Sequence, residues 1–346
     1  MARARLQAWL LCAALTCAGP LAATLAQAAR GFDLSRPEIR SFIASAAAQP
    51  PLTQAGVIRI LRRAHPQPGV IERMTRPAET VLPWWQYRAN FLNPRRISDG
   101  VRFWSDHRRE LQSVAESQGV APQYVVAILG CETAYGRVTG KDHVLDSLAT
   151  LAFDYPARAD FFRDELLQFL LLSREAHLDP LQVRGSYSGA MGAPQFMPSS
   201  YRRYGVDADA NQHIDLWRNW RDVFASVANL LKANGWQSGA PVLAQAQLAA
   251  GAAVPVAPRM LDLTQTLDGL QAIGITTSSD LPGSTPAVLV SAELASGPAF
   301  RVGFNNFYVL SRYNRSARYA MAVNDLADAL AAAMAAADNP VAHAQP

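Results

Sequence analysis

The sequence has very little cysteine: its 346 residues include only Cys12, Cys17 and Cys131. The first two lie in an N-terminal segment that we expect to be removed, which leaves a single thiol. One thiol excludes an intramolecular disulfide even in an oxidising compartment, so the fold must be stabilised by packing. The apolar neighbours of Cys131 indicate an inert, packed thiol rather than a nucleophile.

Net charge is also low. The 32 basic and 28 acidic residues sum to +4, and the sum falls to +2 if Arg3 and Arg5 are removed with the N-terminal segment. A charge this small does not indicate nucleic acid as a partner. Half of the residues are apolar and 17% are charged, which is typical of a soluble globular protein with roughly two or three cores.

Long hydrophobic runs are confined to the first thirty residues. Two arginines precede an apolar run over 6–25 that a Gly-Pro pair interrupts, and Ala26-Gln27-Ala28 supplies the small-x-small pattern of a cleavage site. These features predict a signal peptide over 1–28 and an exported protein. The helix breakers disfavour an uncleaved membrane anchor. Lipid attachment at Cys12 or Cys17 is also disfavoured, because neither cysteine follows the Leu-small-small sequence that lipoprotein processing usually needs. No later segment is expected to span a bilayer.

Helical periodicity dominates the middle of the chain. An aromatic cluster over 83–88 is expected in a loop, and a loop rich in glycine and serine covers 185–198. One helix is expected to be apolar on all sides and hence buried, namely the one that has Pro122 in its first turn. The expected helices start at Ser98 (ending at Gly119), at Pro122, at Arg158 (ending at His177) and at Trp220 (ending at Gly235).

The composition changes after the last of these helices. The segment 240–258 is rich in Ala, Gln, Val and Pro and is expected to be a linker or a loosely structured edge. A short helix over 261–273, strands over 287–294 and 300–311, and a helix over 319–336 are expected to follow.

These patterns divide the chain into five parts and predict a mainly α fold of the α+β kind. The parts are a signal peptide (1–28), a helical N-terminal domain (29–120) joined by the C-terminal helix (319–336), a core domain (121–236), a small mixed α and β domain (237–318) and a disordered tail (337–346).

Glu132 is the first candidate for chemistry because of its surroundings. It lies near the end of the apolar helix that starts at Pro122. A carboxyl among apolar side chains is desolvated, which raises its pKa and lets it act as a general acid near neutral pH, as cleavage of an acetal requires. From this residue alone, a buried glutamate held by structural hydrogen bonds is the favoured interpretation.

The loop over 185–198 strengthens the case for a site. Its small residues let a backbone approach a ligand closely, and Ser186 and Gln195 offer polar contacts. The loop lacks the lysine of a phosphate-binding loop and follows no predicted strand, which excludes nucleotide binding.

A set of longer motifs follows one order along the chain. They are Glu-Thr-x-Tyr-Gly-Arg at 132–137, Tyr-Pro at 155–156, Gly-Ser at 185–186, Gly-Ala-Met-Gly at 189–192, Gln-Phe-Met-Pro-Ser-Ser-Tyr at 195–201 and Arg-Tyr-Asn at 312–314. Together they closely resemble the lytic murein transglycosylase B family, of the glycoside hydrolase family 103 type, over nearly the whole mature chain.

The resemblance implies a lysozyme-like helical core domain and an enzyme that cleaves the β-1,4 bond between N-acetylmuramic acid and N-acetylglucosamine in peptidoglycan. Glu132 would protonate the glycosidic oxygen and then, as a base, take the proton of the C6 hydroxyl, whose oxygen closes onto C1 as a 1,6-anhydro product. The N-acetyl group of the muramic acid would help to stabilise the developing cation.

The resemblance also implies a periplasmic location, glycan strands and other cell-wall enzymes as partners, no required cofactor, and a monomer. Lipid anchoring to the outer membrane is the less favoured location. Two other classes stay open, a catalytically silent cell-wall binding or scaffold protein and a lysozyme-type hydrolase. The intact Glu132 and Gln195 disfavour the silent protein.

Carried over by position, the family's substrate groove would be lined by Tyr87, Ser186, Gln195 and Asn314. Arg158 would meet the lactyl or peptide carboxylate of the substrate. Its neighbour Ala157 stands where better-known members carry a second arginine, which weakens the expected contact with the peptide stem and leaves the chemistry untouched.

An acidic loop follows the core motifs and resembles the start of an EF-hand. The pattern then fails, because Gln212 replaces the turn glycine and Arg218 stands at the twelfth position. Some family members bind calcium here, so a structural calcium ion and a polar surface turn are both open. The candidate ligands are Asp207, Asp209, Asn211, His213 through its backbone carbonyl, and Asp222.

Overall fold

The computed structural model describes residues 31–75, 82–254 and 261–339. The predicted signal peptide lies outside these residues, as does most of the predicted tail, whose first two residues belong instead to the last helix. The described part is mainly helical, with one five-stranded antiparallel sheet and a separate short antiparallel pair of strands. The predicted mainly α architecture of the α+β kind is therefore confirmed.

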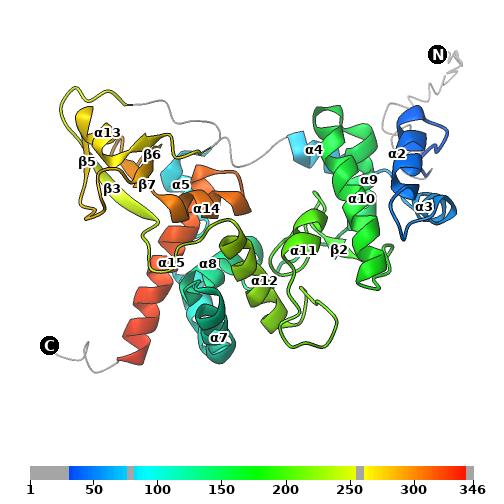
Figure 1. The fold of residues 1–346 in the computed structure, drawn as a ribbon, viewed down its shortest axis with the longest axis horizontal. Coiled ribbons are helices and arrows are strands. Elements are labelled where there is room, and N and C mark those ends of the chain that lie inside the picture. The colour runs from blue at the N-terminus through cyan, green and yellow to red at the C-terminus, as the bar shows by residue number, and fades with distance from the viewer. Residues whose placement is uncertain (1–30, 76–81, 255–260, 340–346) are drawn as a thin grey trace, which may run out of the picture.

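Two helices, α9 (Val144–Asp154) and α10 (Ala159–Glu175), form the centre of one end of the molecule (Figure 1). All of α9 from Val144 to Phe153 is buried, because the surrounding elements cover it on every side. The other elements of this end are α2 (Pro37–Ala47), α3 (Gln54–Leu61), α4 (Pro68–Thr75), β1 (Asp142–His143), the short 3-10 helix η2 (Pro156–Arg158), β2 (Arg184–Gly185) and α11 (Pro198–Tyr204). Of these, α4, β1 and η2 contact α9 directly, as α10 does.

The helix predicted from Pro122 is α8 (Pro122–Thr133), and it lies at the middle of the molecule (Figure 1). Its residues from Val125 to Gly130 are buried, as the apolar sequence predicts. The helices that pack against it are α6 (Pro94–Asp106), α7 (Arg108–Gln118), α12 (Trp220–Ala233) and α15 (Ala317–Asp338). Two further helices, α5 (Trp84–Ala89) and α14 (Asn305–Tyr313), pack against α15.

The sheet has the strand order β4-β6-β7-β3-β5 and is antiparallel throughout. Its second strand, β6, is buried on both faces because successive side chains alternate. Ala287 and Leu289 pack into a small core of the sheet's own, whereas Val288 and Val290 join the main core. The elements here are β3 (Leu243–Leu248), β4 (Gln265–Thr266), α13 (Leu267–Ala272), β5 (Ile275–Thr277), β6 (Pro286–Ser291) and β7 (Phe300–Gly303).

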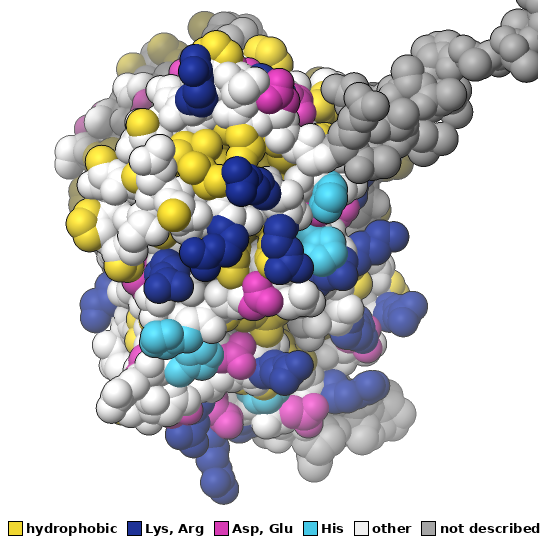
Figure 2. All heavy atoms as spheres, turned by 90° about the vertical axis from the view of Figure 1, so that its right-hand side faces the viewer, with side chains coloured by type: hydrophobic (Ala, Val, Ile, Leu, Met, Phe, Trp, Pro, Cys, Tyr) yellow, Lys and Arg dark blue, Asp and Glu magenta, His cyan; other side chains and the backbone are white. Residues whose placement is uncertain are grey.

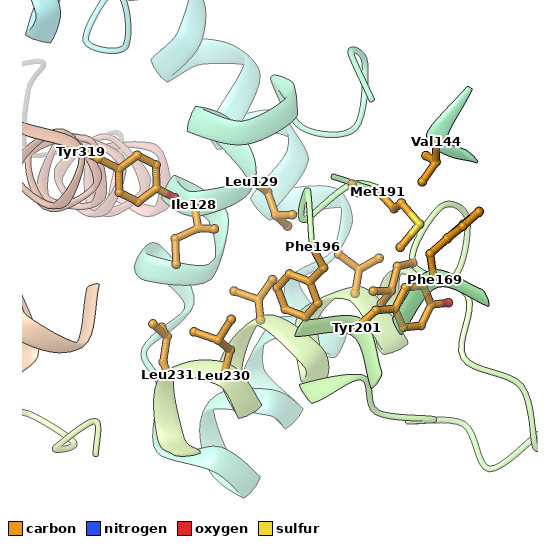
Figure 3. Close-up of a cluster of buried hydrophobic side chains, with 14 of the residues drawn as sticks. Ile128, Leu129, Val144, Phe169, Met191, Phe196, Tyr201, Leu230, Leu231 and Tyr319 are labelled. Carbon is orange, nitrogen blue, oxygen red and sulfur yellow. The ribbon is translucent and has the colours of Figure 1, made fainter. Parts of the chain in front are cut away.

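One continuous hydrophobic core extends from Phe32 near the N-terminal helices to Leu330 in α15. It includes the buried side chains of α8, α9 and α10, so these helices are packed into a single body. Figure 3 shows part of this core, where Leu129 of α8 and Phe196 of the glycine-rich loop both point into the cluster. The division into domains by residue number stays a prediction.

The aromatic cluster over 83–88 was expected in a loop, and this expectation is wrong. Residues from Trp84 to Ala89 form α5, with Pro83 at its N-cap. Trp84 and Tyr87 stand one turn apart and are both buried. Burial of this aromatic face stabilises a helix too short to persist alone.

The helix expected from Ser98 to Gly119 is two helices. The first, α6, starts earlier because Asn93 accepts a hydrogen bond from the amide of Arg96 at 2.9 Å and caps it. His107 leaves helical geometry and separates α6 from α7. The predicted end is correct, since Gly119 has a φ of 72° and terminates α7.

Two expectations for the sheet region are wrong. The supposed linker over 240–258 contains β3, which pairs with both β7 and β5. The supposed strand over 300–311 is β7 followed by α14. Gly303 makes the change of direction possible, because a Cβ there would lie 2.4 Å from the ring of Phe307.

The last helix, α15, is long and apolar enough to cross a membrane by length and composition, with a mean hydropathy of 1.3 over its most apolar window. The expectation that no later segment would reach this threshold is therefore wrong. More than half of that window is buried inside the protein, and its side chains from Tyr319 to Leu330 belong to the main core. The packing is that of a core helix.

Candidate active site

Helix α8 carries Glu132 next to its last residue, Thr133, where the chain makes a sharp and unusual turn. Ala134 and Tyr135 both have positive φ, 51° and 64°, although neither is glycine. Such conformations cost about 1–3 kcal/mol each and persist only where the surroundings enforce them. The strained turn ends α8 directly after Glu132 and leaves the carboxyl half-buried at the helix terminus.

Tyr135 is held by contacts that explain this strain. Its hydroxyl donates to the carbonyl of Arg96 at 2.8 Å, and its ring lies against two glycines. A Cβ on Gly130 would come within 2.8 Å of the Tyr135 hydroxyl, and Gly100 is still tighter. Thr133 adds a second support, since its hydroxyl donates to the carbonyl of Ala193 at 2.8 Å and joins α8 to the glycine-rich loop.

Glu132 accepts a hydrogen bond from the hydroxyl of Tyr319 at 2.7 Å. Tyr319 is buried at the start of α15, and Figure 3 shows it reaching towards α8 beside Ile128. Burial raises the pKa of the Tyr319 phenol well above its usual value, and the charge of Glu132 raises it further. The hydroxyl therefore stays protonated and acts as a permanent donor to the carboxylate.

A second tyrosine supports the first. The ring of Tyr313 stacks on that of Tyr319 with 6.2 Å between centroids, and its hydroxyl donates to the carbonyl of Pro194. Burial and the charge of Glu132 likewise raise the pKa of Tyr313. Among the described residues, Glu132 is the one carboxylate whose charge shifts the pKa of these two tyrosines.

The glycine-rich loop is braced by its own polar groups. The Ser186 hydroxyl accepts the amides of Ala190 at 3.0 Å and Ser188 at 3.3 Å. Gly189 has a φ of 89°, and a Cβ there would lie 2.4 Å from Leu148 of α9. The loop thus lies close against α9, and Ser186 is fixed at its start.

Gln195 adopts a left-handed backbone with φ 51°. Its side-chain amide donates to the carbonyls of Thr139 and Gly192, both at 3.0 Å. One contact is within its own loop and the other is with the segment after α8. Gln195 therefore ties the glycine-rich loop to the turn that carries Glu132.

The structure brings Glu132, Gln195 and Asn314 into one region, because Asn314 directly follows Tyr313 at the end of α14. Tyr87 of α5 lies near the same helix α15 that carries Tyr319, since its neighbour Arg88 pairs with Asp325. Arg158 lies apart in the fold, at the start of α10. Its guanidinium lies over the rings of Phe161 and Phe162, 4.4 and 5.1 Å from their centroids.

Sequence reasoning missed Tyr319 as a site residue and treated it only as the start of a helix. A buried tyrosine needs a partner for its hydroxyl, so the residue type was a weak signal. The partner lies 187 residues away in the chain, and no local pattern indicates it. Cys131 was assessed correctly as inert, because burial, with the adjacent Glu132 charge, raises the pKa of its thiol and keeps it neutral.

The acidic loop gathers three of the five candidate calcium ligands. Carboxylate oxygens of Asp207, Asp209 and Asp222 all lie within 4.8 Å of one another. Burial raises the pKa of Asp222, and the charges of Asp209 and Asp207 raise it further. A divalent cation would offset this repulsion. Asn211 faces inward to the loop, where its side-chain oxygen accepts the amide of His213 at 2.8 Å.

A half-buried glutamate at a helix end, with a tyrosine donor on its carboxylate and a glycine-rich loop hydrogen-bonded to the same helix end, has the form of the general acid of a lysozyme-like glycan-cleaving enzyme. The chain belongs to the family described as the transglycosylase SLT domain, which matches residues 35–328. The prediction of a lytic transglycosylase family is confirmed.

Known relatives agree with this assignment. The chain is 42% identical over 250 residues to the membrane-bound lytic murein transglycosylase B of Escherichia coli (strain K12), which covers 72% of this chain and 68% of the relative. Its structure is similar to that of the catenated lytic transglycosylase SltB1 of Pseudomonas aeruginosa. The TM-score is 0.82 at 41% identity, over 86% of this chain and 98% of that one.

Two further solved structures contain ligands. The lytic transglycosylase SLT35 of Escherichia coli in complex with calcium has a TM-score of 0.79 and 36% identity, over 88% of this chain and 96% of that one. SltB3 of Pseudomonas aeruginosa in complex with NAG-anhNAM-pentapeptide has a TM-score of 0.72 and 33% identity, over 84% of this chain and 78% of that one.

Proposed function

We propose that this chain is a peptidoglycan lytic transglycosylase in which Glu132 performs both proton transfers. The observation that carries the proposal is the single carboxylate of Glu132 with the Tyr319 hydroxyl 2.7 Å away. A hydrolase that uses two carboxylates would require a second one within about 5–10 Å. The proposed reaction needs only one, and the charge of Glu132 raises the pKa of both buried tyrosines beside it.

The reaction that the family resemblance implies fits this geometry. Protonated Glu132 gives its proton to the glycosidic oxygen between N-acetylmuramic acid and N-acetylglucosamine, and the C1–O bond breaks. The N-acetyl group of the muramic acid stabilises the positive charge that develops at C1. The ionised carboxylate then takes the proton of the C6 hydroxyl on the same sugar. The C6 oxygen bonds to C1, which closes the 1,6-anhydro ring and returns the carboxyl to its starting state.

Tyr319 positions the carboxyl in both steps. Because its phenol stays protonated, it donates most strongly when Glu132 is ionised, which favours the state formed between the two transfers. Tyr313, stacked on it, keeps the ring in place. The strained turn after α8 fixes the backbone of Glu132, so the acid is held in position before substrate binds.

We assign the walls of the substrate groove to Tyr87, Ser186, Gln195 and Asn314. Gln195 and Asn314 are supported by their position beside Glu132 and Tyr313. Ser186 keeps a hydroxyl at the start of the glycine-rich loop. Arg158 is proposed to meet a substrate carboxylate farther along the same groove, since its guanidinium is exposed and engages only aromatic faces among the described residues.

Product analysis tests the proposed reaction. Digestion of purified sacculi should release fragments that end in 1,6-anhydro-muramic acid, detected by mass spectrometry as a loss of 18 Da relative to a reducing end. The ring closes because the C6 oxygen, not water, attacks C1. Reducing ends would instead identify a lysozyme-type hydrolase, and intact sacculi would indicate a silent wall-binding protein.

Peptidoglycan lies in the cell envelope, so the proposed substrate places the protein there. The relative from Escherichia coli is named membrane-bound, which places that relative in the envelope as well. We propose the periplasm, following the predicted signal peptide. Glycan strands are the proposed partner, and the neighbouring SltB3 structure contains a fragment of this kind with its pentapeptide.

We further propose that the acidic loop binds one structural calcium ion through Asp207, Asp209 and Asp222, with Asn211 and the carbonyl of His213 completing the shell. The neighbouring SLT35 structure contains calcium. The ion would supply charge neutralisation to the loop before α12. No step of the sugar chemistry involves it.

Calcium should raise the thermal midpoint of unfolding by about 5 °C at a hundredfold excess over Kd, because it binds only the folded loop. Asp209→Asn, which alters an exposed member of the carboxylate group, should abolish that shift. Asp106→Asn, an exposed acid on α6, should retain it. Differential scanning calorimetry with calcium and with EDTA measures both. An equal calcium shift in the two variants would exclude the site.

A further inference from the structure

Two adjoining hollows lie at the end of the molecule formed by α3 and the last turn of α10. Their volumes are about 660 and 360 Å³. Arg63 and Leu181 line both, so the hollows form one continuous depression. Figure 2 shows arginine and histidine side chains across the middle of this face. Besides Thr53 and Ser173, the polar lining comprises Arg59, Arg62, Arg63, Arg174, His65, His143, His177, Asp146, Asp179 and Gln182.

The four arginines of this depression belong to none of the ion pairs that join described residues. Ten ion pairs join described residues elsewhere in the protein, and none of them includes Arg59, Arg62, Arg63 or Arg174. All four side chains are exposed. In a chain of low net charge, four unpaired guanidinium groups around one depression form a local anion-attracting field.

The two carboxylates in the lining are already engaged. Asp146 accepts the amide of His65 at 2.9 Å, and Asp179 accepts the amide of Leu181 at 3.0 Å. Both keep their negative charge, so the lining holds four arginines against two carboxylates and has a formal excess of two positive charges. The depression therefore has excess donor capacity for an anionic ligand with several acceptor oxygens.

The floor of the larger hollow is apolar. Leu52 and Val57 are buried beneath it, and Pro51, Leu178 and Pro180 complete its walls. A concave apolar floor with a basic rim fits a short peptide that has small apolar side chains and several carboxylates. Arginine binds carboxylates in a bidentate manner, which suits such a ligand.

A membrane surface fits this face less well. Binding to lipid requires exposed apolar side chains that enter the bilayer. Among the described residues, the large apolar side chains with high exposure line neither hollow; they are Trp85, Val138, Phe161, Val254, Ile273 and Leu294.

The depression also lies near the proposed groove. Gln182 lines the smaller hollow, and Ser186, assigned to the groove, follows four residues later. Fully extended chain covers at most about 14 Å over this distance. Between them His143 of β1 pairs with Arg184 of β2, which fixes the two regions relative to one another.

We infer that this depression, which we call the arginine exosite, binds an acidic wall peptide of a glycan strand next to the one being cut. The inference rests on the proposed function for the identity of the polymer. A second contact with the same meshwork keeps the enzyme near its substrate and raises the effective concentration of cleavable strands.

Binding of the free wall pentapeptide, measured by isothermal titration calorimetry on the full mature chain, tests the inference. Arg63→Gln/Arg174→Gln should weaken binding by about tenfold, because two charge-assisted contacts are lost. The matched control, Arg109→Gln/Arg203→Gln, removes the same charge from exposed sites on α7 and α11 and should bind like the unaltered protein. Equal affinity in the two variants would overturn the proposal.

Activity assays separate this inference from the proposed reaction. The exosite variant should cleave peptide-bearing sacculi about five- to tenfold more slowly, yet cleave peptide-free glycan strands at the normal rate. Equal rates on sacculi would contradict the exosite. Failure of every variant to cleave peptide-free strands would contradict the proposed function. The calorimetric measurement of peptide binding would still test the exosite in that case. Exosite-dependent binding to phosphatidylglycerol vesicles without peptide binding would identify a lipid and overturn the proposal.

Discussion

Glu132→Gln is expected to lower kcat on glycan strands by about 10³-fold or more, because one residue supplies both the acid and the base. Glutamine is nearly isosteric and can still accept the hydrogen bond from Tyr319, so the fold and the affinity for substrate should be retained. It cannot donate and recover a proton. Release of anhydro-muramic products, followed by chromatography and mass spectrometry, measures the effect.

Glu116→Gln provides the matched control for this experiment. Glu116 is exposed on α7 and accepts a hydrogen bond only from Gln112 among the described residues, so the same chemical change there should leave kcat unaltered. Thermal unfolding of both variants checks that the fold is intact. A Glu132→Gln protein that keeps more than a tenth of the normal turnover would require a different catalytic acid.

Asp325→Ala is expected to cost about 3–5 kcal/mol in the free energy of unfolding, the range found when one partner of a buried ion pair is removed. Asp325 of α15 is buried and accepts from Arg88 of α5 at 2.7 Å and from Arg301 of β7 at 2.6 and 3.1 Å. Only 12% of the Arg301 side chain is exposed, so its charge would lose its hydrogen-bonded carboxylate in a largely buried place. Urea denaturation followed by circular dichroism measures the loss.

The control lies at the other end of the same helix. Asp338 pairs with Arg108 at 2.8 Å, but both side chains are about half exposed, and such pairs contribute little. Asp338→Ala should therefore leave the urea midpoint almost unchanged. If both variants lost the same stability, burial of the pair at Asp325 would not be the cause.

Much of the helical framework could be predicted from the sequence. The helix at Pro122, the helix over 158–177 and the end of α7 at Gly119 follow from periodicity and from capping residues, which act locally. The predicted strand over 287–294 is also present as β6. In each case the signal and the structure depend on the same few neighbouring residues.

The errors arose where distant contacts determine the local structure. The supposed linker contains β3, whose alanines and glutamines have low strand propensity but lie between β5 and β7. The sequence of α14 alternates like that of a strand. The close packing of Gly303 against the ring of Phe307, which accompanies the change from strand to helix, cannot be inferred from that alternation. Local sequence cannot reveal a partner that arrives from another part of the chain.

Prediction of the site residues from the sequence has the same limit. Glu132, Ser186 and Gln195 could be proposed from motifs, since each stands in a distinctive run of residues. Tyr319 stands in an ordinary helical sequence, and its role appears only when α15 packs beside α8. The three carboxylates of the acidic loop lie close in sequence, and their grouping could be anticipated.

The placement of Tyr319 has a consequence for the order in which the protein becomes active. Its hydroxyl and Glu132 are separated by 187 residues, and α15 is the last helix of the described chain. A nascent chain that already contains α8 still lacks the donor for its catalytic carboxyl and the apolar face that covers it. The catalytic carboxyl therefore gains its hydrogen-bond donor only after α15, the last of the described helices, has packed beside α8.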